Sequence, residues 1–200
     1  MIRYDLDLVA SWIAPGSKVL DLGCGQGELL QHLHDTKGVQ GFGVEQDEEK
    51  AATGISRGVS ILQGDMAGEV RDYPDNAFDV VVLSQTLQQV AEPLGLIRQM
   101  LRVGKRAVVS FPNFAHWRNR CQLFFQGNAP VTPELPYDWH DTPNIRVITF
   151  RDFHRFCNRF GFTILEAVAV KTDPASRGGL VLRLLPNLRA TYGIFLLARS

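Results

Sequence analysis

The chain has few cysteines and no long hydrophobic run, and both absences narrow the classes of protein to which it can belong. Its 200 residues include three cysteines, Cys24, Cys121 and Cys157, and these are widely spaced. An odd and scattered set predicts neither a disulfide framework nor a zinc site. Residues 1–5 lack the features of a signal peptide, and no stretch of about 18 residues is wholly apolar. We therefore expect a cytoplasmic protein with no metal and no membrane span.

An excess of charge of either sign is also missing. There are 21 basic and 21 acidic side chains, so the formal net charge is zero. We therefore expect no attraction to nucleic acid or to anionic membranes, although basic residues gather at 102–106 and at Arg118 and Arg120. Hydrophobic residues make up 45% of the chain, which is ordinary for a globular protein. The length predicts one α/β domain over residues 1–200 that buries about 70% of the unfolded surface.

The most informative feature present is an apolar strand that runs into three alternating glycines. Residues 19–27 read Val-Leu-Asp-Leu-Gly-Cys-Gly-Gln-Gly. Glycines in such a turn let a ligand approach the backbone at the carboxyl edge of a parallel sheet. The spacing differs from the dinucleotide fingerprint, because Gly27 follows Gly25 by two residues and not three. Asp21 would repel a pyrophosphate but suits a cationic amino group. The pattern resembles the first motif of the class I S-adenosylmethionine (SAM) methyltransferase fold.

Two further acids follow the glycines at the ends of predicted strands. Residues 40–45 read as a second strand that ends in Glu45, at the distance where a carboxylate accepts hydrogen bonds from ribose hydroxyls. A third strand, residues 59–63, precedes Gly64, Asp65 and Met66. The resemblance implies that Asp65 faces the adenine amino group of SAM or S-adenosylhomocysteine and that an apolar neighbour lies against the ring. The predicted cofactor-binding residues are Asp21, Gly23, Cys24, Gly25, Gly27, Glu45, Gln46, Asp65, Met66 and Ser84.

The rest of the chain alternates between helical and strand patterns, as a Rossmann-like doubly wound fold requires. The apolar run 78–83 predicts a central parallel strand buried on both faces. Thr149 to Asp152 reads as a capping box before an aromatic helix that stops at Gly161. Strands are expected at 163–170 and 193–198. The resemblance implies a mostly parallel sheet of seven strands with an antiparallel last strand.

The resemblance extends to a narrower family. Residues 19–27, 84–90, 111–120 and 137–150 make the whole chain similar to the MetW family of methionine biosynthesis proteins. That family resemblance implies a role in methionine synthesis beside a homoserine O-acyltransferase. Methyl transfer is suggested by the fold alone.

Residues for the chemistry of methyl transfer are harder to find. Residues 84–87 read Ser-Gln-Thr-Leu, where methyltransferases of nucleic-acid amino groups carry an Asn/Asp-Pro-Pro-aromatic signature. Gln89 stands where many small-molecule relatives have histidine, and an amide cannot act as a general base. The remaining candidates are His116, His140 and His154. His154 fits a structural role in the aromatic helix, and His140 fits a polar turn equally well, so no catalytic residue is assigned.

Two long connections leave two functions open. Residues 114–148 greatly exceed the usual loop of about 4–6 residues and are rich in aromatic residues and proline, while 171–189 contain the apolar run 180–186. Residues 114–148 suit a substrate lid, a docking surface or a flap packed on its own core. The apolar run in 171–189 is either buried within the subunit or a contact for another protein. We favour a SAM-binding accessory subunit of the acyltransferase, because the cofactor motifs are complete and the reacting residues are not. The alternative is a methyltransferase that acts on a small metabolite.

Overall fold

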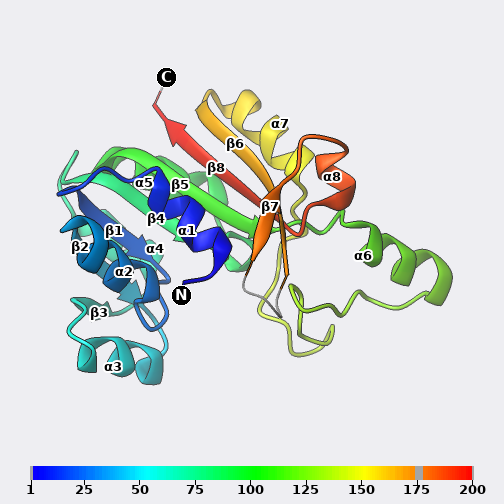
Figure 1. Ribbon diagram of the computed structural model, residues 1–200, viewed down its shortest axis with the longest axis horizontal. Coiled ribbons are helices and arrows are strands. Elements are labelled where there is room, and N and C mark those ends of the chain that lie inside the picture. The colour runs from blue at the N-terminus through cyan, green and yellow to red at the C-terminus, as the bar shows by residue number, and fades with distance from the viewer. Residues whose placement is uncertain (1, 174–177, 200) are drawn as a thin grey trace.

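The strands of the chain join into one sheet, which fixes where the glycine turn lies (Figure 1). The computed structural model describes residues 2–173 and 178–199. The strands within these residues are β1 (Lys18–Leu22), β2 (Gln40–Glu45), β3 (Ile61–Gln63), β4 (Phe78–Ser84), β5 (Gly104–Pro112), β6 (Thr163–Thr172), β7 (Gly179–Val181) and β8 (Tyr192–Ala198). Their order across the sheet is β3-β2-β1-β4-β5-β8-β6-β7. The first five pair in parallel, and β8 lies antiparallel between β5 and β6.

This arrangement confirms the predicted fold class, and the described residues form eight strands where seven were predicted. The additional strand is β7, which pairs antiparallel with the end of β6. It belongs to the segment 171–189 that the sequence suggests is a connection. Its three residues are all exposed, so they give no burial alternation from which a strand could be read. Residues 174–177 of the same connection lie outside the described part of the chain.

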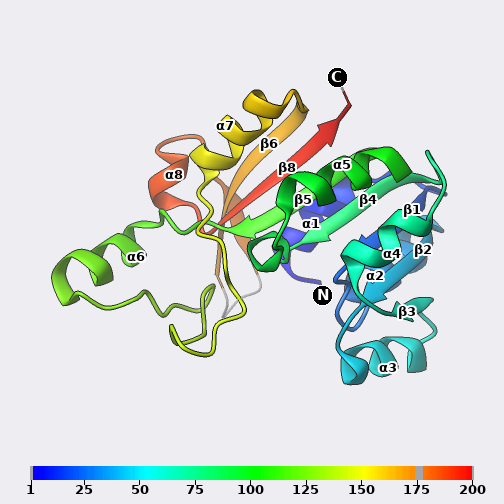
Figure 2. The same cartoon turned by 180° about the vertical axis from the view of Figure 1, so that it is seen from behind.

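Helices cover both faces of the sheet. One face carries α1 (Tyr4–Ser11) and α2 (Glu28–Lys37), which lie in front in Figure 1. The other carries α4 (Met66–Asp72), α5 (Pro93–Val103) and α7 (Phe150–Phe160), seen from their side in Figure 2. α3 (Glu48–Ser56) contacts β2 and β3 at the sheet edge. In β4, Val80 and Val82 join one core cluster, and Val81 and Leu83 join the other. The prediction of a strand buried on both faces is therefore confirmed.

Local sequence signals set the ends of α7 where they were predicted. Thr149 Oγ1 accepts a hydrogen bond from Asp152 N at 3.1 Å and donates to Asp152 Oδ2 at 2.7 Å. Gly161 ends the helix with φ 74°, a conformation that costs glycine little. Between these caps Phe153 is buried, and its ring lies 4.9 Å from Phe111 and 4.7 Å from Phe195. The aromatic stripe therefore packs in the core at Phe153, as expected, with Phe156 partly buried against it and Phe160 exposed at the end of the helix.

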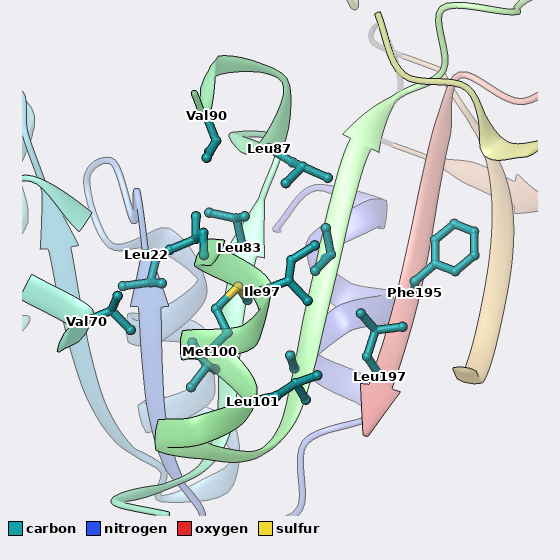
Figure 3. Close-up of a cluster of buried hydrophobic side chains, with 14 of the residues drawn as sticks. Leu22, Val70, Leu83, Leu87, Val90, Ile97, Met100, Leu101, Phe195 and Leu197 are labelled. Carbon is teal, nitrogen blue, oxygen red and sulfur yellow. The ribbon is translucent and has the colours of Figure 1, made fainter. Parts of the chain in front are cut away.

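Helix α5 provides the centre of the core on its face of the sheet (Figure 3). Ile97 and Met100 point from this helix toward Leu83 and Leu22, and Leu101 lies further along the helix beside β5. All five side chains are buried. Packing of this apolar face positions the loop that links β4 to α5, and that loop borders the candidate site.

The predicted insertion 114–148 leaves the sheet as a projection. It begins with α6 (Trp117–Cys121), which continues into the π-helical turn η2 (Gln122–Gln126), a short helix that the sequence analysis does not foresee. Both views show this helix at the far end of the molecule from β3 (Figures 1 and 2). α8 (Pro186–Arg189) precedes β8. Among the described residues, no helix has the length and hydrophobicity to cross a bilayer.

The core around α5 gives a stability prediction. Ile97 is fully buried between α5 and the sheet, so Ile97→Ala should lower the free energy of unfolding by about 2–5 kcal/mol through lost burial and a residual cavity. Urea denaturation would measure the change. Arg98→Ala, at the exposed neighbouring position on the same helix, is the matched control and should change stability by less than about 0.5 kcal/mol. Equal losses in the two variants would contradict the packing described above.

Candidate functional site

A cavity of about 360 Å³ opens beside the ends of β1, β2 and β4, where the glycine turn begins. The chain continues from β1 toward β2 on one side and from β4 toward β5 on the other, so this is the switch point where open α/β sheets bind ligands. Eight of the ten predicted cofactor-binding residues line the cavity: Asp21, Gly23, Cys24, Gly25, Glu45, Gln46, Met66 and Ser84. Gly27 and Asp65 lie outside its lining.

Asp21 is the most perturbed group in the cavity. Its side chain is 3% exposed, and Oδ1 has no hydrogen-bond partner among the described residues. Burial, and then the nearby Glu45 carboxylate, raises the pKa of Asp21 from 3.8 to about 7. An unpaired carboxylate oxygen on a cavity wall is suited to a cationic donor. A ligand that carries an ammonium group would supply both the missing hydrogen bond and the counter-charge.

Glu45 ties the second strand to the glycine turn. Its Oε2 accepts a hydrogen bond from Gly25 N at 2.7 Å, and its Oε1 accepts one from Asp47 N at 3.0 Å. Each carboxylate oxygen can accept more than one hydrogen bond, so these contacts leave acceptor capacity for ligand hydroxyls. Glu45 therefore shapes the turn as well as lining the cavity, a second role that the sequence spacing does not reveal.

Two of the turn glycines are required by close contacts, and the third leaves space. Gly23 has φ 71°, and a Cβ there would lie 2.8 Å from Thr86 Oγ1. Gly27 caps α2 with φ 74°, and a Cβ there would lie 2.9 Å from Val59. Gly25 has φ 57° with nothing within 4 Å of an added Cβ, so its backbone faces open space through which a ligand can approach. Gly27 therefore allows the start of α2 to pack closely against Val59.

Cys24 has the surroundings of a packing residue and not of a nucleophile. Burial raises the pKa of its thiol strongly, and the negative charges of Asp21 and Glu45 raise it further. The reactive thiolate is therefore suppressed. The sulfur fills the space beside Gly43, where an added Cβ would lie 2.5 Å from it.

Asp65 is placed differently from the other predicted site residues. It is exposed, and its Oδ2 accepts a hydrogen bond from Gly68 N at 2.9 Å, which caps α4. The following residue, Met66, does line the cavity. Ser84 lines it too, with its hydroxyl 3.0 Å from that of Ser110, and Gln46 contributes an exposed amide at the rim.

Sequence reasoning missed a polar cluster that joins the first helix to the end of β4. Gln85 Nε2 donates to Asp5 Oδ2 at 2.6 Å, and Arg3 forms an ion pair with the same carboxylate at 3.1 Å. Gln85 also has φ 54°, an uncommon value for a residue with a side chain, and such strain is often found at functional sites. Its position directly after a buried strand was the available signal. Arg3, Gln85, Thr86 and Gln89 all line the cavity.

A second cavity, of about 510 Å³, adjoins the first, and Arg3, Glu28, Gln85 and Gln89 line both. None of the three histidines suggested as bases lines either one. His116 is buried at the start of α6, where burial lowers its pKa, and it accepts a hydrogen bond from Arg118 N at 3.4 Å. His140 and His154 are exposed. No group of metal-ligating side chains occurs in residues 2–173 or 178–199.

Comparison of the sequence with known proteins gives a family match over nearly the whole chain. The family model described as methionine biosynthesis protein MetW matches residues 3–197. A curated relative, the bifunctional methionine biosynthesis protein MetXA/MetW of Rhodopirellula baltica, is 35% identical over 185 residues. That alignment covers 88% of this chain and 30% of the relative, so this chain spans under a third of the bifunctional protein.

Solved structures are similar in fold at low sequence identity. A SAM-dependent methyltransferase of Thermotoga maritima, described as a possible histamine N-methyltransferase, has a TM-score of 0.69 at 16% identity, with 98% of this chain and 87% of that chain covered. The [4+2]-cyclase SpnF has a TM-score of 0.66 at 21% identity, with 98% and 80% covered. At these identities the comparison establishes the fold and leaves the activity open.

The raised pKa of Asp21 makes the stability of the free protein depend on pH. The folded-state pKa lies above the unfolded value, so the contribution to stability is full below about 3.8 and is lost as pH rises through about 7. Asp21→Asn should therefore be more stable than the parent at pH 8, by a few kcal/mol at most, and nearly equal to it at pH 4. Thermal unfolding at the two pH values would measure this.

Asp35→Asn, on the exposed surface of α2, serves as the control and should give the same small change at both pH values. A parent protein that gains stability over Asp21→Asn between pH 4 and 8 would contradict the assigned environment of Asp21.

Proposed function

The chain belongs to the MetW family of methionine biosynthesis proteins, and from that premise we propose that it binds SAM and serves as an accessory subunit of a homoserine O-acyltransferase. S-Adenosylhomocysteine would bind in the same cavity. The single observation that carries the cofactor assignment is the buried, unpartnered Oδ1 of Asp21, which lies in a cavity with a second carboxylate, Glu45.

The charges of the cavity favour SAM over a phosphate-bearing nucleotide. Asp21 and Glu45 would both repel a pyrophosphate, whereas SAM carries an ammonium and a sulfonium group and no phosphate. The open space above Gly25 suits close approach of the ligand to the backbone, and the Glu45 carboxylate suits the ribose hydroxyls. The adenine contact predicted for Asp65 is kept as part of the proposal, with Asp65 capping α4 in the free protein.

Two independent observations support the partner. The Rhodopirellula relative unites a MetXA part and a MetW part in one chain, and we take the MetXA part to be the acyltransferase that the family resemblance implies. Fusion of two proteins is a natural outcome when they act together. The projection formed by α6 and η2 also exposes large apolar side chains, with Phe124 and Phe125 exposed by 82% and 76%. Such exposure on a soluble surface favours contact with another protein.

The proposed partnership has a regulatory rationale. SAM is made from methionine, and homoserine acylation is an entry step of methionine synthesis. A SAM-binding subunit on the entry enzyme would therefore let the end product adjust the flux. Binding of SAM and binding of the partner must then influence each other by the same factor, as linkage requires.

The second candidate function is methyl transfer to a small metabolite. The observation that favours it is the second cavity, which adjoins the first through shared residues, as an acceptor site would. Against it stands the position of the histidines, because none of the three candidate bases lines either cavity. The fold itself does not decide between an accessory subunit and a methyltransferase, since a structure of this fold is described as a cyclase.

The proposed ribose contact gives the first functional prediction. Glu45→Ala should weaken SAM binding by about ten- to a hundredfold, because the hydroxyls lose a charged acceptor worth roughly 1.5–3 kcal/mol and Gly25 N loses its partner. Titration calorimetry on the purified protein would measure the affinity. Glu48→Ala, three residues further on the exposed start of α3, is the matched control. Unchanged affinity in Glu45→Ala, or tight NAD binding by the parent protein, would refute the assignment.

The second functional prediction concerns the exposed apolar side chains of the projection formed by α6 and η2, which we propose as the docking surface for the partner. Phe124→Ala and Phe125→Ala should each weaken association with the acyltransferase by about 2 kcal/mol, roughly thirtyfold, if they act as aromatic anchors. Trp117, Trp139, Leu184 and Leu185 are further exposed candidates. Leu182 is not, because it is buried against Ala169 and Ala190, so the apolar run 180–186 is not exposed along its whole length. Pull-down with the purified acyltransferase would measure association.

The control for this experiment is Ile55→Ala, which removes an exposed apolar side chain from α3, far from the projection. All variants should keep the SAM affinity of the parent. If the phenylalanine variants bind the acyltransferase normally but lose turnover of a methyl acceptor, the segment is a substrate lid and the protein is a methyltransferase.

A further inference from the structure

We propose that the second cavity is a separate binding site for a small molecule that carries a protonated primary amine. The cavity lies between the start of α1, the turn η1 (Leu87–Gln89), the segment 133–144 and the ends of β6 and β8. Its volume of about 510 Å³ suffices for a metabolite beside a ligand in the first cavity. The proposal does not depend on which ligand occupies the first cavity.

The first reason is a shortage of hydrogen-bond donors. Gln88 and Asn144 line the cavity, and the amide oxygens Gln88 Oε1 and Asn144 Oδ1 are buried without a partner among the described residues. Gln88 is only 4% exposed, and its amide nitrogen is held by Gln85 O at 2.7 Å. Buried polar atoms are rarely left unpaired in a folded protein. Two such acceptors on one cavity call for a ligand with several N–H or O–H donors.

The second reason is the sign of the charge around the cavity. Within the described part of the chain, the lining includes the acidic residues Asp5, Glu28 and Glu134 and one cation, Arg3. Arg3 already pairs with Asp5 through both Nε and Nη2. The carboxylates of Asp5 and Glu134 also help to raise the pKa of the Tyr192 hydroxyl, after burial, so their field reaches the same cavity. A cation is therefore favoured over an anion.

Glu134 is the acid best placed to receive that cation. It lies in a tight turn closed by two hydrogen bonds between Thr132 and Leu135, each of 3.0 Å, and both of those residues are buried. The turn therefore holds Glu134 in place. On its other side Glu134 borders a third cavity with His116, Arg118 and Lys171, none of which lines the second. Glu134, Gln88 and Asn144 line the same cavity, so an ammonium group bound there has a carboxylate and amide oxygens as acceptors.

Titration with a simple amine tests the proposal directly. The probe is n-butylammonium, followed through the NMR signals of the Gln88 and Asn144 side-chain amides in protein free of SAM. We expect saturable shifts with millimolar affinity, because so small a ligand makes few contacts. The neutral n-butanol and the anionic butyrate, of similar size, should not saturate the site. Tighter binding of either one, or no saturable shift with the amine, would overturn the proposal.

Two variants separate ligand binding from structural roles. Glu134→Gln should weaken amine binding about tenfold, and Glu166→Gln, an exposed change on β6 outside all these cavities, should not. Asn144→Leu removes the unpartnered oxygen and should weaken amine binding without lowering the melting temperature. If Asn144→Leu loses stability but keeps its affinity for the amine, the Asn144 amide is structural and its proposed role in binding is overturned. Calorimetry with SAM on the same variants keeps this outcome distinct from a failure of the cofactor proposal.

Discussion

The burial of one carboxylate, Asp21, beside a second, Glu45, is the constraint around which the site is arranged. Asp21 is the next-to-last residue of β1 and Glu45 is the last residue of β2, and parallel pairing brings these strand ends to one edge of the sheet. Glu45 is held by the N–H groups of Gly25 and Asp47, whereas Asp21 Oδ1 has no partner among the described residues. Burial of Asp21, and then the negative charge of Glu45, favour the protonated carboxyl group, so the pKa of Asp21 rises to about 7. A bound cation would instead favour the ionised carboxylate.

This constraint also explains why the turn must be made of glycine. The backbone of residues 23–27 has to bend sharply enough for Gly25 N to reach Glu45 while keeping its outer surface open. Side chains at Gly23 and Gly27 would collide with Thr86 and Val59. The glycines thus leave the space for a ligand because they lack side chains, and the two carboxylates give the site its negative charge. Substitution of either acid would change the ligand that the same backbone accepts.

The strand-end acids could be found from the sequence because their positions follow from the period of the strands. Once β1, β2 and β4 are read as buried parallel strands, the residues that follow them must share an edge. The contact of Asp5 with Gln85 could not be found this way, because it joins residues 80 positions apart through the packing of α1. The strand β7 and the burial of Leu182 were missed for a related reason. Both depend on how β6 extends, and the local sequence there has no periodic signal.

The segment that carries the exposed aromatic residues is bonded to the turn that borders both cavities. The N–H groups of Ile145 and Arg146 donate to Gln88 O at 3.0 and 2.9 Å, and the Arg146 guanidinium contacts the carbonyl oxygens of Val90 and Ala91. Gln88 in turn holds Gln85 O through its side chain. A ligand that fixes residues 85–89 therefore restrains one end of the segment 114–148 through direct hydrogen bonds. A bound ligand can change the affinity for the partner only to the extent that it binds one arrangement of this segment more tightly than another. These direct hydrogen bonds are a short connection between the cavities and the segment, so the coupling requires no rearrangement of the sheet.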